Sequence, residues 1–200
     1  MTTILIATGN HHKLKEIRSF FSDSQIELIS FKDLKLSSPE ESGKSFYENA
    51  MIKAKFGFEA SGLPTIADDS GLCVEILNGQ PGIHSARFAG ADATDEENRR
   101  KLLNEIDFSQ GNIKAYFVCC VVAKLSNDFT LQCEEQWHGE IINFETGDHG
   151  FGYDPIFYLK EKQKTAAELS ETEKNKISHR GKAFSKILDQ LKSSTHGKSY

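Results

Sequence analysis

Hydrophobic and polar residues follow one another at the start of the chain with the periods of a strand, a helix and a second strand. The apolar run at residues 4–7 predicts a short buried strand. The polar sequence TGN at 8–10 ends it, and Asn10 is the expected N-cap of a helix whose apolar side chains recur at helical spacing as far as Phe21. Residues 26–31 predict the second strand, so the chain opens with a βαβ unit.

Capping boxes, in which Ser or Thr is followed three residues later by Glu, predict the start of three more helices. They occur at Ser45–Glu48, Thr94–Glu97 and Ser170–Glu173. The first of these helices is rich in alanine and is expected to end at Gly62, because glycine commonly closes a helix. A final helix is expected after Gly181 interrupts the helical run, and its apolar stripe consists of Ala183, Phe184, Ile187, Leu188 and Leu191.

Two further segments complete the expected sheet. Residues 64–72 predict a buried strand that ends in Asp68-Asp69 and a Ser-Gly turn. Residues 115–142 predict a long antiparallel hairpin around a turn at 126–128. Parallel strands early in the chain and a hairpin later make the sheet mixed. The pattern therefore predicts a single α/β domain over residues 1–200, with helices flanking a central mixed sheet.

Composition and charge narrow the possible partners. A hydrophobic content of 38% in 200 residues is enough for the buried core of one domain. The net charge of −5 gives no general field that would attract nucleic acid or an anionic membrane, so we expect neither as a partner. The N-terminal apolar run is too short for a signal peptide or a membrane helix, and we expect a cytoplasmic protein with reduced cysteines.

The loop before the first helix is a candidate phosphate site. It offers the hydroxyl of Thr8, the backbone of Gly9 and the side-chain amide of Asn10 at a helix N-terminus, with Lys13 one turn further on. A lysine in the first turn opposes the helix dipole unless an anion is sometimes bound there. The alternative is an ordinary capped helix with a solvated lysine.

Adjacent carboxylates at the end of a buried strand form a candidate metal site. Asp68 and Asp69 need solvent, a cation or hydrogen-bond donors, and because successive strand side chains diverge, one should face structure and the other a ligand. Glu40 and Glu41 could bring another carboxylate. Mg²⁺ typically takes one or two carboxylates and completes its shell with water and substrate phosphates. The alternative is a turn or a helix cap.

Two segments near the C-terminus could recognise a base. Phe151-Gly152-Tyr153-Asp154 places aromatic rings and a carboxylate in one rigid loop, which could stack a base or could simply be a hairpin turn with buried rings. Lys174, His179 and Arg180 are donors gathered before the last helix, and their alternative is a solvated basic face.

Seven ordered motifs connect these candidates to a known family. They are ATGNHHKLKEI, ESGKSFYENAMIKA, ADDSGL, PGIHSARFAG, GFGYDPIF, KTAAELS and ISHRG. Together they resemble the inosine triphosphate pyrophosphatase family, from about Ile4 to the last helix. The resemblance implies an elongated α/β fold with two lobes around a deep substrate cleft, a homodimer, and Mg²⁺-dependent hydrolysis of ITP, dITP or XTP to the monophosphate and pyrophosphate.

The resemblance also implies roles for individual residues. Asp69 would be the general base and a Mg²⁺ ligand, and Glu40 would be the second metal carboxylate, with Glu41 as the open alternative. The substrate-binding residues would be Thr8, Gly9, Asn10, His11, His12, Lys13, Ser70, Phe151, Gly152, Tyr153, Asp154, Lys174, His179 and Arg180. His11 and His12 would contribute through their backbone only. His84 stands where the family pattern leads us to expect a tyrosine, which leaves local contacts and the dimer surface open.

The residues suggest a mechanism and two rivals. Asp69 would direct a water at the α-phosphorus, Lys13 would neutralise phosphate charge, and His179 or Arg180 would donate to the 6-keto oxygen of the purine. One rival is a pyrophosphatase for modified pyrimidine nucleotides, which the FGYD and SHRG motifs disfavour. The other is a module that binds a purine nucleotide without cleaving it, which would gain little from a carboxylate beside the triphosphate.

Overall fold

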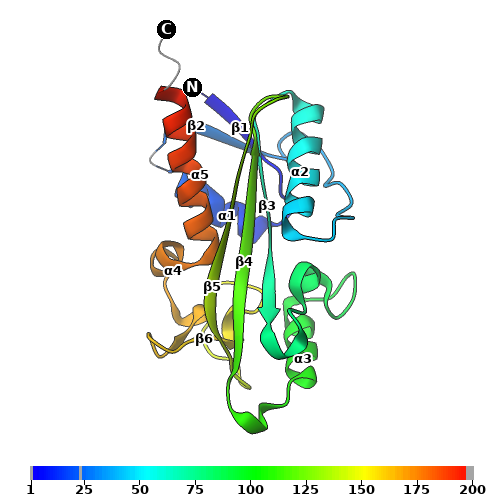
Figure 1. Ribbon diagram of the computed structural model, residues 1–200, viewed down its shortest axis with the longest axis vertical. Coiled ribbons are helices and arrows are strands. Elements are labelled where there is room, and N and C mark those ends of the chain that lie inside the picture. The colour runs from blue at the N-terminus through cyan, green and yellow to red at the C-terminus, as the bar shows by residue number, and fades with distance from the viewer. Residues whose placement is uncertain (1, 23, 197–200) are drawn as a thin grey trace. The chain divides into compact units, whose positions relative to one another are not determined.

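The computed structural model describes residues 2–22 and 24–196 (Figure 1). Its strands are β1 (Thr2–Ile6), β2 (Ile26–Ser30), β3 (Thr65–Val74), β4 (Ile113–Lys124), β5 (Thr130–Ile141), β6 (Phe157–Leu159) and β7 (Lys164–Thr165). Its helices are α1 (His11–Phe20), α2 (Phe46–Ser61), α3 (Asp95–Glu105), α4 (Glu171–Ile177) and α5 (His179–His196), and short 3-10 helices connect several of these elements.

The strands form a seven-stranded sheet in the order β2-β1-β3-β4-β5-β6-β7. β1 pairs in parallel with β2 and with β3, whereas β6 pairs antiparallel with both β5 and β7. The predicted mixed α/β sheet is therefore confirmed. The expected caps also form: Asn10, Ser45, Thr94 and Ser170 each cap a helix N-terminus, and Gly62 closes α2 in a left-handed conformation.

Two boundaries differ from the expectation. β3 continues through Ser70 and Gly71 to Val74, so the paired aspartates lie inside a strand rather than at its end. The buried residues after Gly71 keep the chain extended, and this outweighs the turn tendency of Ser-Gly. The last helix begins at His179, so Gly181 lies within its first turn and does not interrupt it.

The described chain consists of two compact units. Unit 1 comprises the residues up to Asp69, then Cys119–Glu135 and the residues from Arg180 onward. Unit 2 comprises Ser70–Val118 and Gln136–His179. That the two units act as one domain stays a prediction from the sequence.

In unit 1, side chains alternate between the two faces of the sheet. Ile4, Ile6 and Ile66 pack with residues of α1 and α5 in one apolar cluster. Leu5 and Ala67 pack with residues of α2 in another. α2 therefore covers one face of this part of the sheet, and α1 and α5 cover the other (Figure 1).

Unit 2 has a separate apolar core. Phe117 of β4, Trp137 of β5 and Phe157 of β6 form an aromatic group, with Phe117 and Phe157 centroids 4.6 Å apart. Leu102 of α3 packs in the same core. The core also holds Tyr153, one of the predicted base-contact residues, which is 4% exposed.

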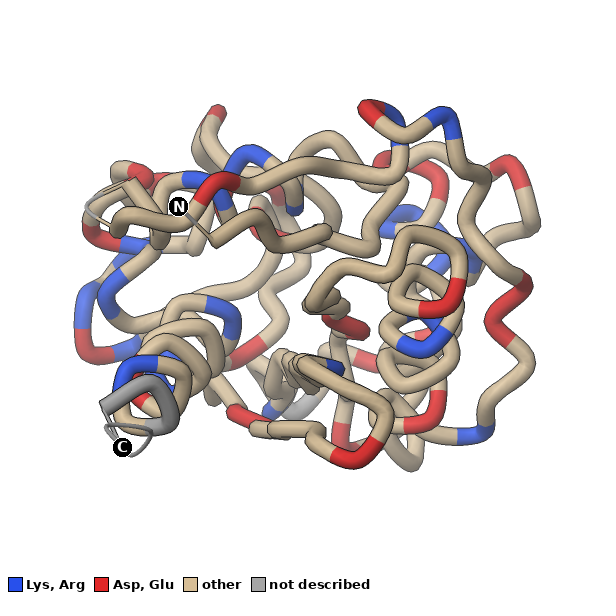
Figure 2. Tube along the Cα trace, turned by 90° about the horizontal axis from the view of Figure 1, so that it is seen from above, with Lys and Arg blue, Asp and Glu red and all other residues tan. Residues whose placement is uncertain are grey.

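Charged residues are mixed along the chain. Figure 2 shows Lys and Arg interspersed with Asp and Glu rather than gathered in one stretch of the trace. Any strong local field must therefore come from a few residues held in place by the fold. No helix among the described residues is long and apolar enough to cross a membrane.

Candidate active site

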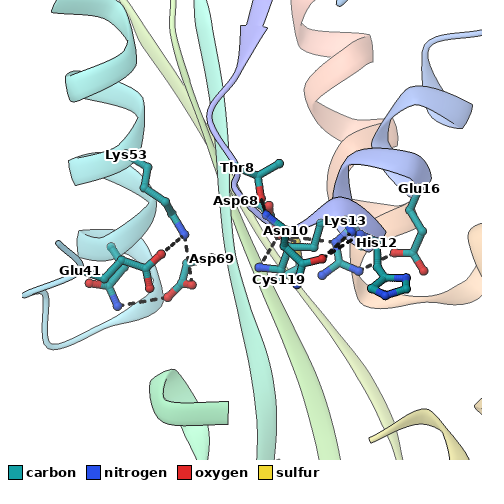
Figure 3. A network of polar contacts seen from close by, with 12 residues as sticks. Thr8, Asn10, His12, Lys13, Glu16, Glu41, Lys53, Asp68, Asp69 and Cys119 are labelled. Atoms are coloured by element: carbon teal, nitrogen blue, oxygen red, sulfur yellow. Dashed lines mark hydrogen bonds and ion pairs between the residues drawn. The ribbon is translucent and has the colours of Figure 1, made fainter. Parts of the chain in front are cut away.

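Asp68 and Asp69 point to opposite faces of the sheet. Because strand side chains alternate, Asp68 lies on the face of Ile66, toward α1 and α5, and Asp69 lies on the face of Ala67, toward α2. Figure 3 shows the two carboxylates at the centres of two separate polar groups on either side of β3. The expectation that the two aspartates diverge is therefore confirmed.

On the α2 face, both oxygens of Asp69 are held by side chains of one helix. Asn49 Nδ2 donates to Asp69 Oδ2 at 3.2 Å, and Lys53 Nζ lies 3.4 Å from Oδ1. Lys53 also forms an ion pair of 2.6 Å with Glu41 Oε1. Asn49 Oδ1 accepts the amide N–H of Gly43, which fixes the loop that carries Glu41. Asp69 thus has a defined orientation.

The surroundings raise the pKa of Asp69, which favours a proton acceptor, and raise the pKa of Lys53, which keeps it charged. Burial raises the pKa of Asp69, and the opposing charges of Lys53 and Lys13 do not cancel the effect. Burial would by itself lower the pKa of Lys53, but Asp69, Asp68 and Glu41 raise it above its usual value. The arrangement can accept a proton at Asp69 while Lys53 keeps its positive charge.

On the other face, Asp68 lies between two cations. Lys13 Nζ is 3.2 Å and Arg180 Nε is 3.5 Å from Asp68 Oδ2, and Arg180 Nη1 also donates to Glu16 Oε2 at 2.5 Å. Burial would raise the pKa of Asp68, but Lys13 and Arg180 hold it well below its usual range. Asp68 Oδ1 has no hydrogen-bond partner among the residues described. Asp68 is therefore an anion at neutral pH, and it holds Lys13 and Arg180.

The predicted phosphate loop is a capped helix start. Asn10 Oδ1 accepts the amides of His12 and Lys13 at 2.9 and 3.1 Å, and Thr8 Oγ1 accepts the amide of Asn10 at 3.2 Å. A Cβ on Gly9 would lie 3.0 Å from Ser38 Oγ, so the segment that leads to the acidic pair passes close by. The first turn of α1 contains no acidic residue, and Lys13 supplies the nearby positive charge.

The structure distinguishes the two neighbouring glutamates. Glu41 joins the Asp69 group through Lys53, whereas Glu40 is exposed. The predicted metal role of Glu40 stays a prediction, and Glu41 is the glutamate that the fold links to Asp69.

In unit 2, the loop at residues 151–154 is tied to α4. Asp154 Oδ2 accepts the amide of Phe151 at 2.9 Å and pairs with Lys174 Nζ at 2.6 Å. Lys174 Nζ also lies 5.1 Å from the centroid of the Phe151 ring. The hydroxyl of Tyr153 donates to the carbonyl oxygen of Ser85 at 2.9 Å. These contacts link the loop to α4 and to the carbonyl oxygen of Ser85.

His179 lies in a stack of aromatic rings. Its imidazole is nearly parallel to Phe117, with centroids 4.8 Å apart and planes 8° apart, and Trp137 lies 6.1 Å away. The ring is thus held in one plane at the start of α5. Ser70, also in unit 2, is partly exposed within β3.

The predicted residues divide between the two units. Unit 1 contains Thr8, Gly9, Asn10, His11, His12, Lys13, Glu40, Asp69 and Arg180, and unit 2 contains Ser70, Phe151, Gly152, Tyr153, Asp154, Lys174 and His179. Within unit 1 the structure joins Lys13 and Arg180 through Asp68. Within unit 2 it joins Phe151, Asp154 and Lys174 directly.

Sequence reasoning missed three residues of the site: Asn49, Lys53 and Glu16. Asn49 and Lys53 are four residues apart on α2 and lie on its buried stripe with Ala50 and Ala54. A polar pair at helical spacing within an otherwise apolar stripe is a detectable signal, because such groups need buried partners. Glu16 had no such signal, since its partner Arg180 is distant in the sequence.

Comparisons with known proteins identify the family of this chain. The Ham1 family model matches residues 4–190. The dITP/XTP pyrophosphatase of Escherichia coli (strain K12) is 45% identical over 195 residues, which cover 96% of this chain and 99% of the relative. The dITP/XTP pyrophosphatase of Mannheimia succiniciproducens is 46% identical over 193 residues, covering 94% and 97%.

Solved structures give the same result. A HAM1 protein from Coxiella burnetii superposes with a TM-score of 0.89 at 40% identity, covering 96% of this chain and 100% of that one. The Ham1 protein of Staphylococcus aureus gives 0.83 at 37% identity, covering 99% and 100%. Sequence and fold thus match over almost the whole length, and the chain belongs to the Ham1 family.

Proposed function

We propose that this protein hydrolyses ITP, dITP and XTP to the nucleoside monophosphate and pyrophosphate, and so removes these non-standard purine nucleotides before they enter DNA or RNA. The proposal rests on one observation above the others: a chain of the Ham1 family holds a buried carboxylate, Asp69, by both oxygens beside a charged lysine. The relatives named above carry the name dITP/XTP pyrophosphatase, which supports the same reaction.

The substrate's charge must be offset before water can attack phosphorus. A nucleoside triphosphate carries close to four negative charges, and cations with helix N-termini are the usual means of neutralising them. In our proposal the ammonium of Lys13 binds phosphate oxygens, together with the segment that runs from Thr8 into the first turn of α1. Asp68 supports this role because it fixes the ammonium of Lys13.

Asp69 would act as the general base. A carboxylate whose pKa is raised by burial is a stronger proton acceptor than an exposed one, and Asn49 and Lys53 fix the direction of its oxygens. It would orient a water and take its proton as the water oxygen bonds to the α-phosphorus and the bond to pyrophosphate breaks. No covalent intermediate with the protein is needed.

The acidic residues near Asp69 fit a magnesium ion. Asp69 and Glu41 already share one cation, Lys53, at 3.4 and 2.6 Å. Mg²⁺ typically takes one or two carboxylates and completes its shell with water and substrate phosphates. Asp69 with Glu41 or Glu40 would hold Mg²⁺. Mg²⁺ polarises phosphate oxygens and stabilises a leaving pyrophosphate.

Selectivity would depend on the 6-keto oxygen of hypoxanthine or xanthine. A donor on His179 or Arg180 would form a hydrogen bond with this oxygen. The 6-amino group of adenine is itself a donor and could not accept that hydrogen bond. Leaving such a donor unpaired costs about 1–3 kcal/mol. We expect Ser70, Phe151, Gly152, Tyr153, Asp154 and Lys174 to complete the contacts with substrate, and His11 and His12 to contribute backbone only.

The proposal includes a homodimer and a cytosolic location, where nucleotide pools are used. Gel filtration with light scattering would test the first, and a monomer at micromolar concentration would contradict it. Fractionation of the source cells would test the second.

Product analysis tests the reaction directly. The protein is incubated with ITP, XTP, GTP and ATP, with Mg²⁺ and with excess chelator, and the phosphate products are separated. We expect monophosphate and pyrophosphate in one step from ITP and XTP, much slower turnover of ATP, and loss of activity with chelator. Formation of diphosphate and orthophosphate would contradict the proposal.

A further inference from the structure

The segment at residues 145–152 in unit 2 needs external contacts to keep one conformation. Gly147, Gly150 and Gly152 all have positive φ, at 89°, 77° and 63°. Glycine loses more conformational freedom on folding than other residues do, so a segment of this composition is not held by its own backbone. The end of this segment overlaps with residues 151–154, which are predicted to contact the purine.

Two residues of α3 hold both peptide groups of Gly152. Its amide N–H donates to Asp95 Oδ2 at 2.7 Å, and its carbonyl oxygen accepts from Arg99 Nη1 at 2.8 Å. Asp95 and Arg99 are four residues apart and therefore lie on the same face of the helix. One helical turn thus fixes the peptide planes on both sides of Gly152.

Arg99 also holds the beginning of the segment. Its Nη2 lies 2.9 Å from Glu145 Oε2, so one planar guanidinium meets two acceptors seven residues apart. The side chain keeps both contacts although its buried Nε has no hydrogen-bond partner among the described residues, which costs stability. The two contacts with the segment determine where this guanidinium lies.

The helix end that carries Asp95 is itself fixed. Thr94 and Glu97 form a complete capping box immediately around it. Asn98, which is 2% exposed, accepts the amide of Ala89 at 2.8 Å and donates to the carbonyl oxygen of Ala86 at 3.2 Å. Asp95 and Arg99 therefore project from a rigid support.

We propose that Asp95 and Arg99 are positioning residues that set purine selectivity by fixing the loop at residues 151–154, an inference that rests on the proposed function. Neither residue would touch the reacting phosphate. They hold the backbone of Gly152, which lies between the two aromatic residues of the loop. Recognition of a base depends on donors and rings held to a fraction of an ångström, so a looser loop binds the correct base less well and rejects the wrong one less strongly.

Kinetics of matched arginine variants test the role. Arg99→Gln is compared with Arg100→Gln, since Arg100 is an exposed arginine of the same helix that pairs with Glu96. We expect Arg99→Gln to raise KM for ITP and to lower the ITP/ATP ratio of kcat/KM by about 10-fold, with a smaller change in kcat. Arg99→Lys should recover part of the ratio because one acceptor stays in reach. A lower melting temperature with unchanged KM and ratio would show a merely structural role and overturn the proposal.

Amide hydrogen exchange without nucleotide separates this inference from the proposed function. We expect faster exchange in the peptide containing Gly152 for Arg99→Gln and Asp95→Ala, and unchanged exchange for Arg100→Gln. Unchanged protection in an active background would overturn the positioning role alone. A wild-type protein that releases no pyrophosphate from ITP would instead overturn the proposed function, and the assignment to purine selectivity with it.

Discussion

Asp68 and Asp69 carry the same side chain, yet the protein shifts their pKa values in opposite directions. Both are buried, and burial raises the pKa of a carboxyl group. At Asp68 this effect is outweighed by Lys13 and Arg180, and at Asp69 it prevails over Lys53. A general base works best when its pKa approaches the working pH. The two residues are thus suited to different tasks: Asp68 to holding cations and Asp69 to accepting a proton.

Asp69→Asn is expected to nearly abolish turnover and to leave the protein folded. The amide keeps the shape of the side chain but loses its negative charge and its basicity, and removal of general-base catalysis costs at least about 100-fold. Pyrophosphate release from ITP gives the rate, and a thermal melt shows whether the fold is intact.

Asp68→Asn is the matched control for that experiment. It should destabilise the protein, since Lys13 and Arg180 would lose the anion between them. If Asp68→Asn instead gave the larger fall in kcat with an intact fold, or if Asp69→Asn kept more than about a tenth of the activity, Asp69 would not be the base.

The charge of Asp68 also predicts how stability changes with pH. Its pKa is lower in the folded than in the unfolded state, so it stabilises the fold above the unfolded pKa of about 3.9, and this contribution is lost as pH falls toward the folded pKa. The difference in Tm between wild type and Asp68→Asn should therefore be largest near neutral pH and narrow below about pH 4. A difference that stays constant over this range would show that the shape of Asp68, not its charge, is what matters.

At the scale of elements, the reach of α2 toward Asp69 depends on one glycine. A Cβ at Gly57 would lie 2.7 Å from Thr65 Cγ2 and 3.1 Å from Leu5 Cδ2, so the helix backbone lies directly against the sheet. Lys53 is one turn before Gly57 on the same buried stripe. The close approach of the helix thus brings the ammonium of Lys53 to the carboxylate of Asp69.

Gly57→Ala is expected to lower both stability and activity. Alanine favours a helix by about 1 kcal/mol over glycine, but overpacking a filled core costs about 1–3 kcal/mol and would move α2 away from β3. Urea unfolding and kcat for ITP are the measurements. Glu59→Ala, at an exposed position of the same helix, should change neither by much. A Gly57→Ala protein with higher stability and full activity would contradict the close-packing argument.

Most elements could be predicted because their signals are local. Capping residues and apolar periodicity identify the start of α1, α2, α3 and α4, and the seven motifs identified the family that the comparisons confirm. The extension of β3 through Ser70 and Gly71 could not be predicted, because buried neighbours distant in sequence decide it.

The same reason explains what was missed in the site. The pairing of Lys53 with Glu41 and of Arg180 with Glu16 depends on which side chains the fold brings together, and no local pattern records this. The divergence of Asp68 and Asp69 could be predicted, since it follows from the geometry of a single strand.

At the scale of the whole molecule, four elements contain residues of both units: β3, β4, β5 and α5. If the part of a strand in one unit unfolds, the part in the other unit loses a neighbour that supports it. We therefore expect the chain to unfold cooperatively, as a single domain would. Buried thiols can report on each unit separately, because Cys73 lies in unit 2 and Cys119 in unit 1.

Thiol labelling across a denaturant series should expose Cys73 and Cys119 at the same midpoint. Both are buried, and burial raises the pKa of the Cys119 thiol well above its usual value, so its reaction in the folded state should be very slow. Mass spectrometry of digested peptides identifies the labelled residue. The partly exposed Cys133 should react first and serves as the control. Two clearly separated midpoints for Cys73 and Cys119 would show two independent domains.

Alternation of side chains along β3 makes this strand far more sensitive to changes in length than to changes in composition. Loss of a single codon between Thr65 and Ala67 would turn every later side chain of the strand to the opposite face. The carboxylate of Asp69, which faces α2, would then face α1 and α5 instead. Point substitutions leave this register intact. In a pool of gene variants selected for activity, in-frame deletions in this stretch should therefore be eliminated even where many amino-acid replacements survive.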